Sequence, residues 1–308
     1  MRDRGDREAM GCGLTRRAFL AGAAAAALAL PSRGRAAAPR LALSYGGFAM
    51  GIQSYTLRRL ELAAALDAVR ALGLARVELF TQARVGLFRS VAHFPVTEDA
   101  AEIAHVKALL AERGIALVAH GVNAIGDAAE GRRLLAFAER ARIPTLGCDP
   151  SEAVLPELDA LLAAHPGVRL AIHNHGPRTR YAKIADVERA LAGRHPRLGA
   201  CVDTGHFIRS GEDPVEAIRR VGPRVYGVHL KDFASEGAFA SGVVLGRGKL
   251  DLAGAFRALR AVGFTQERAL SLEYEEDPDD PLPGVEACLR AAAEAAESVA
   301  REARGPAA

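Results

Sequence analysis

Residues 199–232 read GACVDTGHFIRSGEDPVEAIRRVGPRVYGVHLKD, and this stretch contains the unit from which the fold is predicted. A short apolar run, Gly199–Thr204, is followed by a helical pattern over Pro214–Val221. A second apolar run, Val225–Lys231, comes next, and both apolar runs lead into polar residues. This order is typical of a β/α/β unit with parallel strands.

The same alternation extends outward from this unit over most of the chain. The predicted strands are Ala49–Tyr55, Arg76–Phe80, Ala116–Val122, Thr145–Asp149, Arg169–His175, Gly199–Thr204, Val225–Lys231 and Ala269–Tyr274. The predicted helices are Leu60–Leu72, Glu98–Arg113, Asp127–Arg142, Glu157–Ala164, Ala185–Ala192, Pro214–Val221, Leu252–Val262 and Pro283–Ala303. Gly73, Gly114 and Gly263 stand directly before strands, as helix C-caps do. Eight β/α units without a linker predict one α/β domain, a (β/α)₈ TIM barrel.

A separate segment precedes the predicted barrel. Arg16 and Arg17 are followed by an apolar run over residues 21–30 and by small residues at 36–38. This pattern predicts a twin-arginine-type signal peptide over residues 1–38, with the barrel over 39–308 and a periplasmic or secreted product. The apolar run is too short to span a bilayer stably, so no membrane association is expected of the mature form. An uncleaved N-terminal anchor is the alternative.

Charge and cysteine content restrict the kind of partner. Residues 1–38 hold seven Arg and three acidic residues, which leaves 33 basic and 34 acidic side chains in the rest of the chain. A near-neutral domain is unlike one that grips nucleic acid, so a small molecule is the expected partner, and a homo-oligomer stays open. Cys148, Cys201 and Cys288 are odd in number and lack a Cys-x-x-Cys spacing, which predicts buried free thiols.

Polar residues collect where four consecutive strands end. The segments are His173-Asn174-His175, Asp203-Thr204-Gly205-His206, His229-Leu230-Lys231-Asp232 and Glu273-Tyr274-Glu275-Glu276. In a barrel the carboxyl ends of the strands form the active mouth, and residues of equal parity on a strand face the same side. Two carboxylates and two imidazoles there predict one divalent ion, Mn²⁺, Co²⁺, Zn²⁺ or Fe²⁺ rather than Mg²⁺. The alternative is that each histidine is a satisfied core or loop residue.

Several of these runs resemble a known family. They are Cys201-Val202-Asp203-Thr204-Gly205-His206, Val228-His229-Leu230-Lys231-Asp232, Leu272-Glu273-Tyr274, Val77-Glu78-Leu79-Phe80 with His93 downstream, and Leu245-Gly246-Arg247-Gly248-Lys249-Leu250-Asp251. In order and over residues 48–300 they resemble the sugar phosphate isomerase/epimerase family of xylose isomerase-like (AP-endonuclease family 2) TIM barrels. The resemblance implies Asp203, His229 and Glu273 as metal ligands. The resemblance places a fourth metal ligand at His173, where the ketose 3-epimerases of this family have a Glu that is also catalytic. Their pair of proton-shuttling Glu residues is therefore incomplete here.

The resemblance implies a metal-dependent isomerase, epimerase or lyase that acts on a sugar, keto-sugar or polyol through an enediolate-type intermediate. The missing Glu favours isomerisation or β-elimination over C3 epimerisation. Glu273 is the first candidate catalytic residue, and Lys231 is a second if its pKa is lowered; otherwise Lys231 forms an ion pair with Asp232 or Glu275. The candidate substrate-binding residues are His206, His175, Glu78, His120 and Arg247. Glu78 is alternatively a structural partner of an Arg, and Arg247 an anchor of its loop.

Two other functions remain open at this stage. An AP-endonuclease-like metal hydrolase would need further ligands, such as His93 and His120, and a basic groove. A periplasmic sugar-binding barrel without turnover is the non-enzymatic alternative, against which the presence of Glu273, Lys231 and His206 argues.

Overall fold

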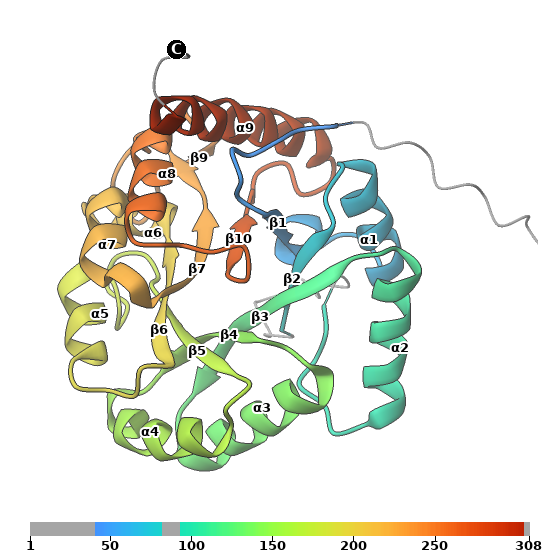
Figure 1. The fold of residues 1–308 in the computed structure, drawn as a ribbon, viewed down its shortest axis with the longest axis vertical. Coiled ribbons are helices and arrows are strands. Elements are labelled where there is room, and N and C mark those ends of the chain that lie inside the picture. The colour runs from blue at the N-terminus through green and yellow to red at the C-terminus, as the bar shows by residue number, and fades with distance from the viewer. Residues whose placement is uncertain (1–40, 82–92, 305–308) are drawn as a thin grey trace, which may run out of the picture. The chain divides into compact units, whose positions relative to one another are not determined.

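The computed structural model describes residues 41–81 and 93–304, and within them eight parallel strands close into a barrel in the order β1-β10-β7-β6-β5-β4-β3-β2 (Figure 1). Helices cover the outside of this barrel, and the described residues belong to one compact unit. The predicted TIM barrel is confirmed. The predicted signal peptide, residues 1–38, lies outside the described residues.

Each barrel strand coincides with a predicted one. The strands are β1 Met50–Gln53, β2 Arg76–Phe80, β3 Ala116–Ile125, β4 Thr145–Pro150, β5 Arg169–His173, β6 Leu198–Asp203, β7 Val225–Leu230 and β10 Ala269–Leu272. Strand β5 ends two residues earlier than predicted because the side-chain amide of Asn174 takes over the pairing with the backbone of Asp203. Strand β7 ends before Lys231, whose N–H donates to the hydroxyl of Thr204.

The helices also follow the prediction, with one addition. They are α1 Leu62–Ala71, α2 Ala100–Glu112, α3 Ala128–Ala141, α4 Leu155–Ala164, α5 Ile184–Leu191, α6 Thr204–Arg209, α7 Pro214–Val221, α8 Leu252–Ala261 and α9 Leu282–Arg304, with short 3₁₀ turns at Ser54–Leu57, Glu152–Val154 and Gly222–Arg224. Helix α6 was not predicted, because it is only six residues long and lacks an apolar repeat. The carboxylate of Asp203 caps it by accepting the N–H of His206.

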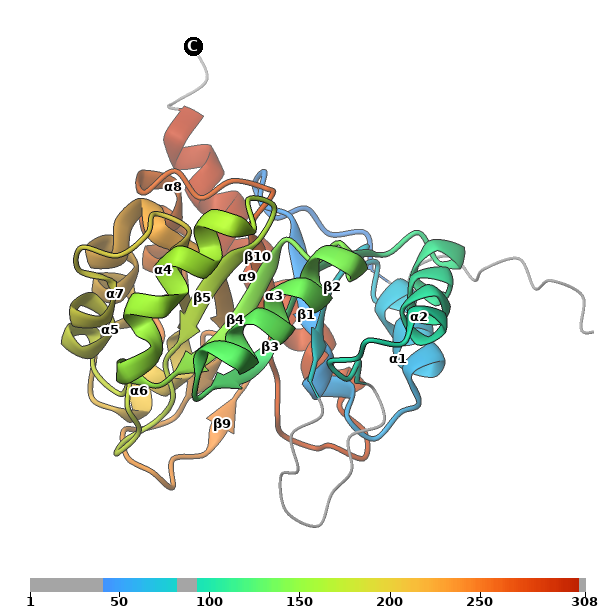
Figure 2. The ribbon, with the colours of Figure 1, turned by 90° about the horizontal axis from the view of Figure 1, so that it is seen from below.

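A small hairpin lies beyond the carboxyl ends of the strands. It consists of β8 (Asp232–Phe233) and β9 (Gly242–Val243) in antiparallel pairing (Figure 2). Asp232 fixes the loop that follows by accepting the backbone N–H groups of Gly246, Gly248 and Leu250. In the described part of the chain, no helix is long and apolar enough to cross a membrane.

The amino ends of the strands are closed by side-chain packing. A Cβ atom on Gly199 would lie 2.2 Å from the carbonyl oxygen of Arg224 and 2.6 Å from the ring of Tyr226, so this glycine makes room for both. The guanidinium groups of Arg169 and Arg268 lie over that ring, at 5.6 and 5.7 Å from its centroid.

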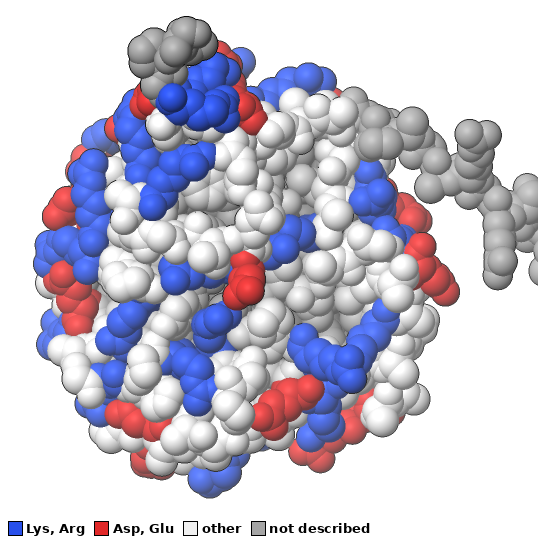
Figure 3. All heavy atoms as spheres, in the orientation of Figure 1, with Lys and Arg blue, Asp and Glu red and all other residues white. Residues whose placement is uncertain are grey.

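Basic and acidic side chains are interspersed on the face drawn in Figure 3.

The apolar core fills the space between the strands and the surrounding helices, with side chains such as Ile52, Leu79 and Leu170 fully buried. The three cysteines of the barrel are buried and free, as predicted.

Candidate metal centre

Four side chains converge at the carboxyl ends of neighbouring strands. They are His173 from β5, Asp203 from β6, His229 from β7 and Glu273, which directly follows β10; all are buried. One ligand atom from each lies within 4.8 Å of the other three. The structure therefore brings together the four residues that the sequence assigned to the metal.

The strand register produces this convergence. Asp203 lies opposite His229 in the β6–β7 pairing, and His173 lies at the end of the β5–β6 pairing. Asn174 holds β5 to β6, because its amide both donates to the carbonyl of Asp203 and accepts its N–H. Thr204 holds β6 to β7, because its hydroxyl donates to the carbonyl of Lys231 and accepts its N–H.

The donor atoms fit a small divalent ion. His173 Nε2 and His229 Nδ1 face each other at 3.0 Å, His229 Nδ1 lies 2.9 Å from Glu273 Oε2, and Asp203 Oδ2 lies 3.5 Å from His173 Nε2. Ligands about 2.0–2.2 Å from one ion are separated from each other by about 3.0–3.5 Å. Asp203 Oδ2 is buried, accepts no hydrogen bond in the described structure and faces the ammonium of Lys231 at 3.3 Å. A divalent cation would satisfy this oxygen, so the residues present fit the metal that the fold family implies.

His229 is oriented by a carboxylate behind it. Its Nε2 donates to Glu78 Oε2 at 2.9 Å, and the hydroxyl of Ser271 donates to the same oxygen at 3.0 Å. This leaves Nδ1 of His229 directed at the ligand cluster, which is the carboxylate–histidine–metal arrangement of many metalloenzymes. Burial alone would lower the pKa of His229, but Cys201, Glu78 and Glu273 raise it well above its usual range.

The structure gives Glu78 a partner that the sequence did not indicate, and its assignment to substrate binding stays a prediction. Its side chain is 1% exposed, and its partner is an imidazole rather than a substrate or an arginine. Glu78 therefore orients His229, a candidate metal ligand.

Lys231 lies among carboxylates at the edge of the cluster. Its Nζ is 3.3 Å from Asp203 Oδ2 and 3.1 Å from Glu273 Oε2, and it donates to Glu275. Burial alone would lower the pKa of Lys231, but these three carboxylates raise it well above its usual range. The lowered pKa that would make Lys231 a base is therefore absent, and the ion pair with Glu275 is present. Lys231 is therefore a buried ammonium group at neutral pH.

Glu273 is correspondingly a carboxylate. Burial alone would raise its pKa, but the charges of Lys231 and His229 and the hydrogen bond from His229 lower it.

Two further imidazoles lie beside the metal ligands. The ring centroids of His173 and His175 are 4.6 Å apart, and those of His175 and His206 are 5.3 Å apart. Burial lowers the pKa of His175 to about 3 and that of His206 well below its usual range. Both are therefore neutral at neutral pH and can donate or accept hydrogen bonds with substrate hydroxyl groups.

The other two predicted substrate residues are not part of this cluster. His120 is fully buried, its Nε2 contacts the carbonyl of Phe94 at 2.7 Å, and its ring packs against Phe94 and Phe137. The ring of His120 is thus used inside the core, and its assignment to substrate binding stays a prediction. Arg247 is exposed in the loop after β9, and no contact joins its side chain to the cluster in the described structure.

The extra ligands required for a trinuclear site are also not brought together. In the described residues, the groups that could hold a metal contain His173 and His229 with either Cys201 or the two carboxylates. Neither His93 nor His120 belongs to such a group.

Sequence reasoning missed several supporting residues, namely Asn174, Thr204, Ser271 and the glycine at 205. A Cβ on Gly205 would lie 2.8 Å from Cγ of Lys231 and 2.6 Å from the ring of Phe233. Helix α6 can therefore approach the end of β7 only with glycine at this position. Asn174 and Thr204 stand next to ligands in the sequence, and their short polar side chains at strand ends were the available signal.

Comparisons with known proteins agree with this geometry. A family model described as xylose isomerase-like TIM barrel matches residues 147–301. An inosose dehydratase of Clostridium botulinum is 30% identical over 138 residues, which are 40% of this chain and 45% of that protein. The chain therefore matches less than half the length of this curated relative.

Solved structures match over more of the chain. An uncharacterised protein from Parabacteroides distasonis is 28% identical, with a TM-score of 0.60, and the match covers 79% of this chain and 97% of that one. A structure of the IOLI protein with a bound zinc atom has a TM-score of 0.66 over 82% of this chain and 99% of that one. At 14% identity the latter is similar in fold alone.

Proposed function

The chain belongs to the xylose isomerase-like TIM barrel family, and from that premise we propose that it is a divalent-metal-dependent lyase that removes water from a keto-polyol or keto-sugar. The observation that carries the proposal is the contact between one carboxylate and one ammonium group at the candidate metal position. Glu273 Oε2 and the ammonium of Lys231 lie 3.1 Å apart. The relation to inosose dehydratases supports the same class of reaction and substrate.

When bound by His173, Asp203, His229 and Glu273, a divalent ion would polarise the substrate carbonyl and make the adjacent C–H bond acidic. The protein's own groups then have two tasks: to accept a proton from this carbon and to donate one to the hydroxyl group that leaves from the next carbon. The carboxylate of Glu273 accepts the first proton. The ammonium of Lys231 donates the second, so that the C–O bond breaks with loss of water.

The 3.1 Å contact also explains how the couple returns to its starting state. After elimination Glu273 carries a proton and Lys231 lacks one, and transfer from one to the other restores both without an external acid or base. A C3 epimerase has a different requirement, since it needs two groups on opposite faces of one carbon. With His173 in place of the second carboxylate, the pair of Glu residues that such an epimerase uses is incomplete.

His175 and His206 would orient the substrate. Both are neutral, and both lie beside the ligand His173. A neutral imidazole has one N–H donor and one acceptor nitrogen, so it can either donate a hydrogen bond to a substrate hydroxyl group or accept one from it. This favours a polyhydroxylated substrate.

The remaining expectations accompany this proposal. We propose that the twin-arginine-type leader directs the enzyme to the periplasm or outside the cell, and that its partner there is a small carbohydrate rather than nucleic acid or membrane. Assembly into a homo-oligomer is compatible with this proposal and is testable by light scattering.

The test is turnover of a panel of keto-polyols and keto-sugars, inosose among them, by protein loaded with Mn²⁺, Co²⁺, Zn²⁺ or Fe²⁺. Mass spectrometry should detect a product that has lost one water, and Glu273→Gln should abolish it. The matched control Glu267→Gln alters an exposed side chain before β10 and should leave turnover unchanged. Solvent deuterium in unchanged or isomeric substrate, without loss of water, would instead assign an isomerase or epimerase. Full turnover by Glu273→Gln would refute the assignment of the acid–base couple.

A further inference from the structure

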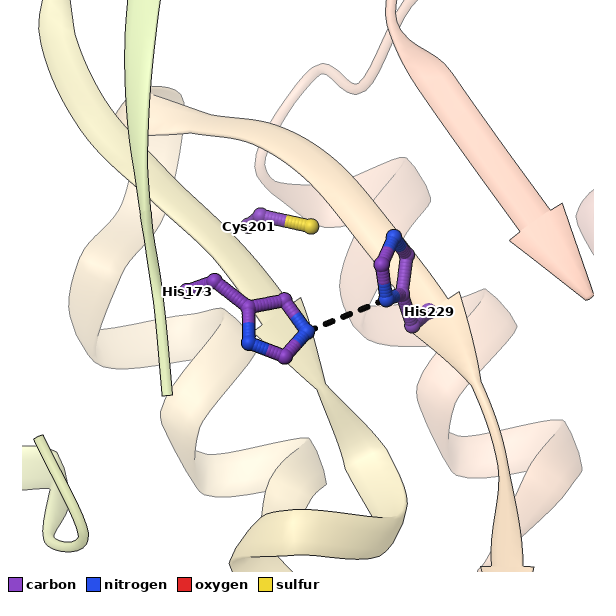
Figure 4. A group of neighbouring side chains, drawn as sticks. All are labelled: His173, Cys201 and His229. Atoms are coloured by element: carbon purple, nitrogen blue, oxygen red, sulfur yellow. Dashed lines mark hydrogen bonds between the residues drawn. The ribbon is translucent and has the colours of Figure 1, made fainter. Parts of the chain in front are cut away.

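A thiol lies beneath two of the imidazoles of the metal centre. Cys201 has the same parity as Asp203 on β6, so both face the interior of the barrel, with Cys201 about 6–7 Å further along the strand towards its amino end. In the strand register Cys201 lies opposite His173 on β5. Figure 4 shows Cys201 between the two histidines, with its sulfur directed towards His229.

The distances place this thiol within reach of an ion. The Sγ atom of Cys201 and one ring nitrogen each of His173 and His229 lie within 4.8 Å of one another. The two imidazoles therefore have oxygen donors on one side, from Asp203 and Glu273, and a sulfur donor on another.

The local packing leaves a defined space for this sulfur. Gly227 lies opposite Cys201 on β7, and a Cβ at Gly227 would lie 3.0 Å from Sγ. On its other side Cys201 packs with Ala171 and Tyr226, and its side chain is 2% exposed. Because these neighbours are apolar, the polar groups nearest the thiol are those of the metal centre.

The two sets of donors differ in the ions that they prefer. Carboxylates suit hard ions such as Mn²⁺ and Mg²⁺, whereas a thiolate with imidazoles suits Zn²⁺, Co²⁺ and other thiophilic ions such as Cd²⁺. We propose that His173, Cys201 and His229 form a second, deeper metal position that takes thiophilic divalent ions and shares both imidazoles with the outer position.

Binding at the deeper position involves no redox change. The S–H bond of Cys201 breaks, a sulfur–metal bond forms, and the proton passes to the solvent. Because the imidazoles are shared, one ion per chain is bound at a time, and the identity of the ion decides which position is filled. The inference concerns ion binding and does not depend on the proposed reaction.

Metal-free protein loaded with one equivalent of Co²⁺ tests this. A sulfur-to-cobalt charge-transfer band should appear in the near ultraviolet, disappear in Cys201→Ser, and persist in the matched control Cys148→Ser. Cys148 is another fully buried cysteine, on β4, which β5 separates from β6. In competition with a chelator, Cys201→Ser should bind Cd²⁺ at least about tenfold more weakly, while its affinity for Mn²⁺ should change much less.

Three outcomes would overturn the proposal: no band in the wild-type protein, a band that persists in Cys201→Ser, or equal loss of Cd²⁺ and Mn²⁺ affinity. If Cys201→Ser fails to fold, the absence of the band from the wild-type spectrum would still overturn the proposal. Thermal melts of the metal-free Cys201→Ser and Cys201→Ala proteins identify a folding defect.

Discussion

Replacing Glu78 by Gln removes the negative charge behind His229 while keeping the size of the side chain. In the structure Glu78 Oε2 accepts hydrogen bonds from His229 Nε2 at 2.9 Å and from Ser271 at 3.0 Å, and both Glu78 and His229 are 1% exposed. A glutamine keeps one acceptor oxygen but loses the charge that makes Nδ1 of His229 a stronger donor to a metal. Loss of such a partner typically weakens metal binding about 10–100-fold, which corresponds to about 1.4–2.7 kcal/mol.

The assay is a competition titration between the protein and a chromophoric chelator, with Mn²⁺ and with Zn²⁺. We expect Glu78→Gln to bind one ion per chain with an affinity lowered by about one to two orders of magnitude. Ser271→Ala, which removes one of the two hydrogen bonds to the same oxygen, should have a smaller effect in the same direction. Glu294→Gln, on the exposed surface of α9, is the matched control. Unchanged affinity in Glu78→Gln, with the fold intact by circular dichroism, would refute the role assigned to Glu78.

The structure supports three further predictions about individual side chains. Lys231→Met should lower kcat by at least about two orders of magnitude while KM changes little, because it removes the proposed proton donor. Steady-state kinetics on the substrate identified from the panel measure both constants, and an unchanged kcat would contradict the prediction. Burial lowers the pKa of His120 to about 4, so below about pH 6.5 the unfolded chain binds a proton that folded His120 does not bind. Denaturant titrations should therefore show that the free energy of unfolding falls by about 3 kcal/mol between pH 6.5 and 4 because of His120. A free energy of unfolding that does not change with pH would contradict this. Gly205→Ala places a methyl group 2.6 Å from the ring of Phe233 and should cost about 1–3 kcal/mol in the same titrations; an unchanged unfolding midpoint would show that α6 can shift without loss.

The sequence predicted the barrel and the ligand set because both depend on short-range patterns. Each strand is a brief apolar run with a polar end, and the parallel arrangement places these ends at one mouth. Thus Asp203, His229 and Glu273 could be grouped although they are far apart in the chain.

The roles of individual side chains were harder to predict, because parity along a strand says which side a residue faces but not how deep it lies. Glu78 has the parity of a residue that faces the interior, yet it lies below the ligands and contacts His229. His120 is enclosed by Phe94 and Phe137, which the sequence places on different elements. The charge state of Lys231 depends on three carboxylates from two other strand ends, and only the folded structure brings them together.

Each residue of the motif Asp203-Thr204-Gly205-His206 has its own structural role at the carboxyl end of β6. One oxygen of Asp203 caps α6 by accepting the N–H of His206, which leaves the other oxygen for the metal. Thr204 ties β6 to β7 at the level of Lys231, and Gly205 lets α6 approach that lysine closely. His206 is thereby held over the mouth beside His173. Because this one tight turn positions a metal ligand, the strand end that carries Lys231 and the imidazole of His206, a change in its backbone should alter metal binding and turnover together.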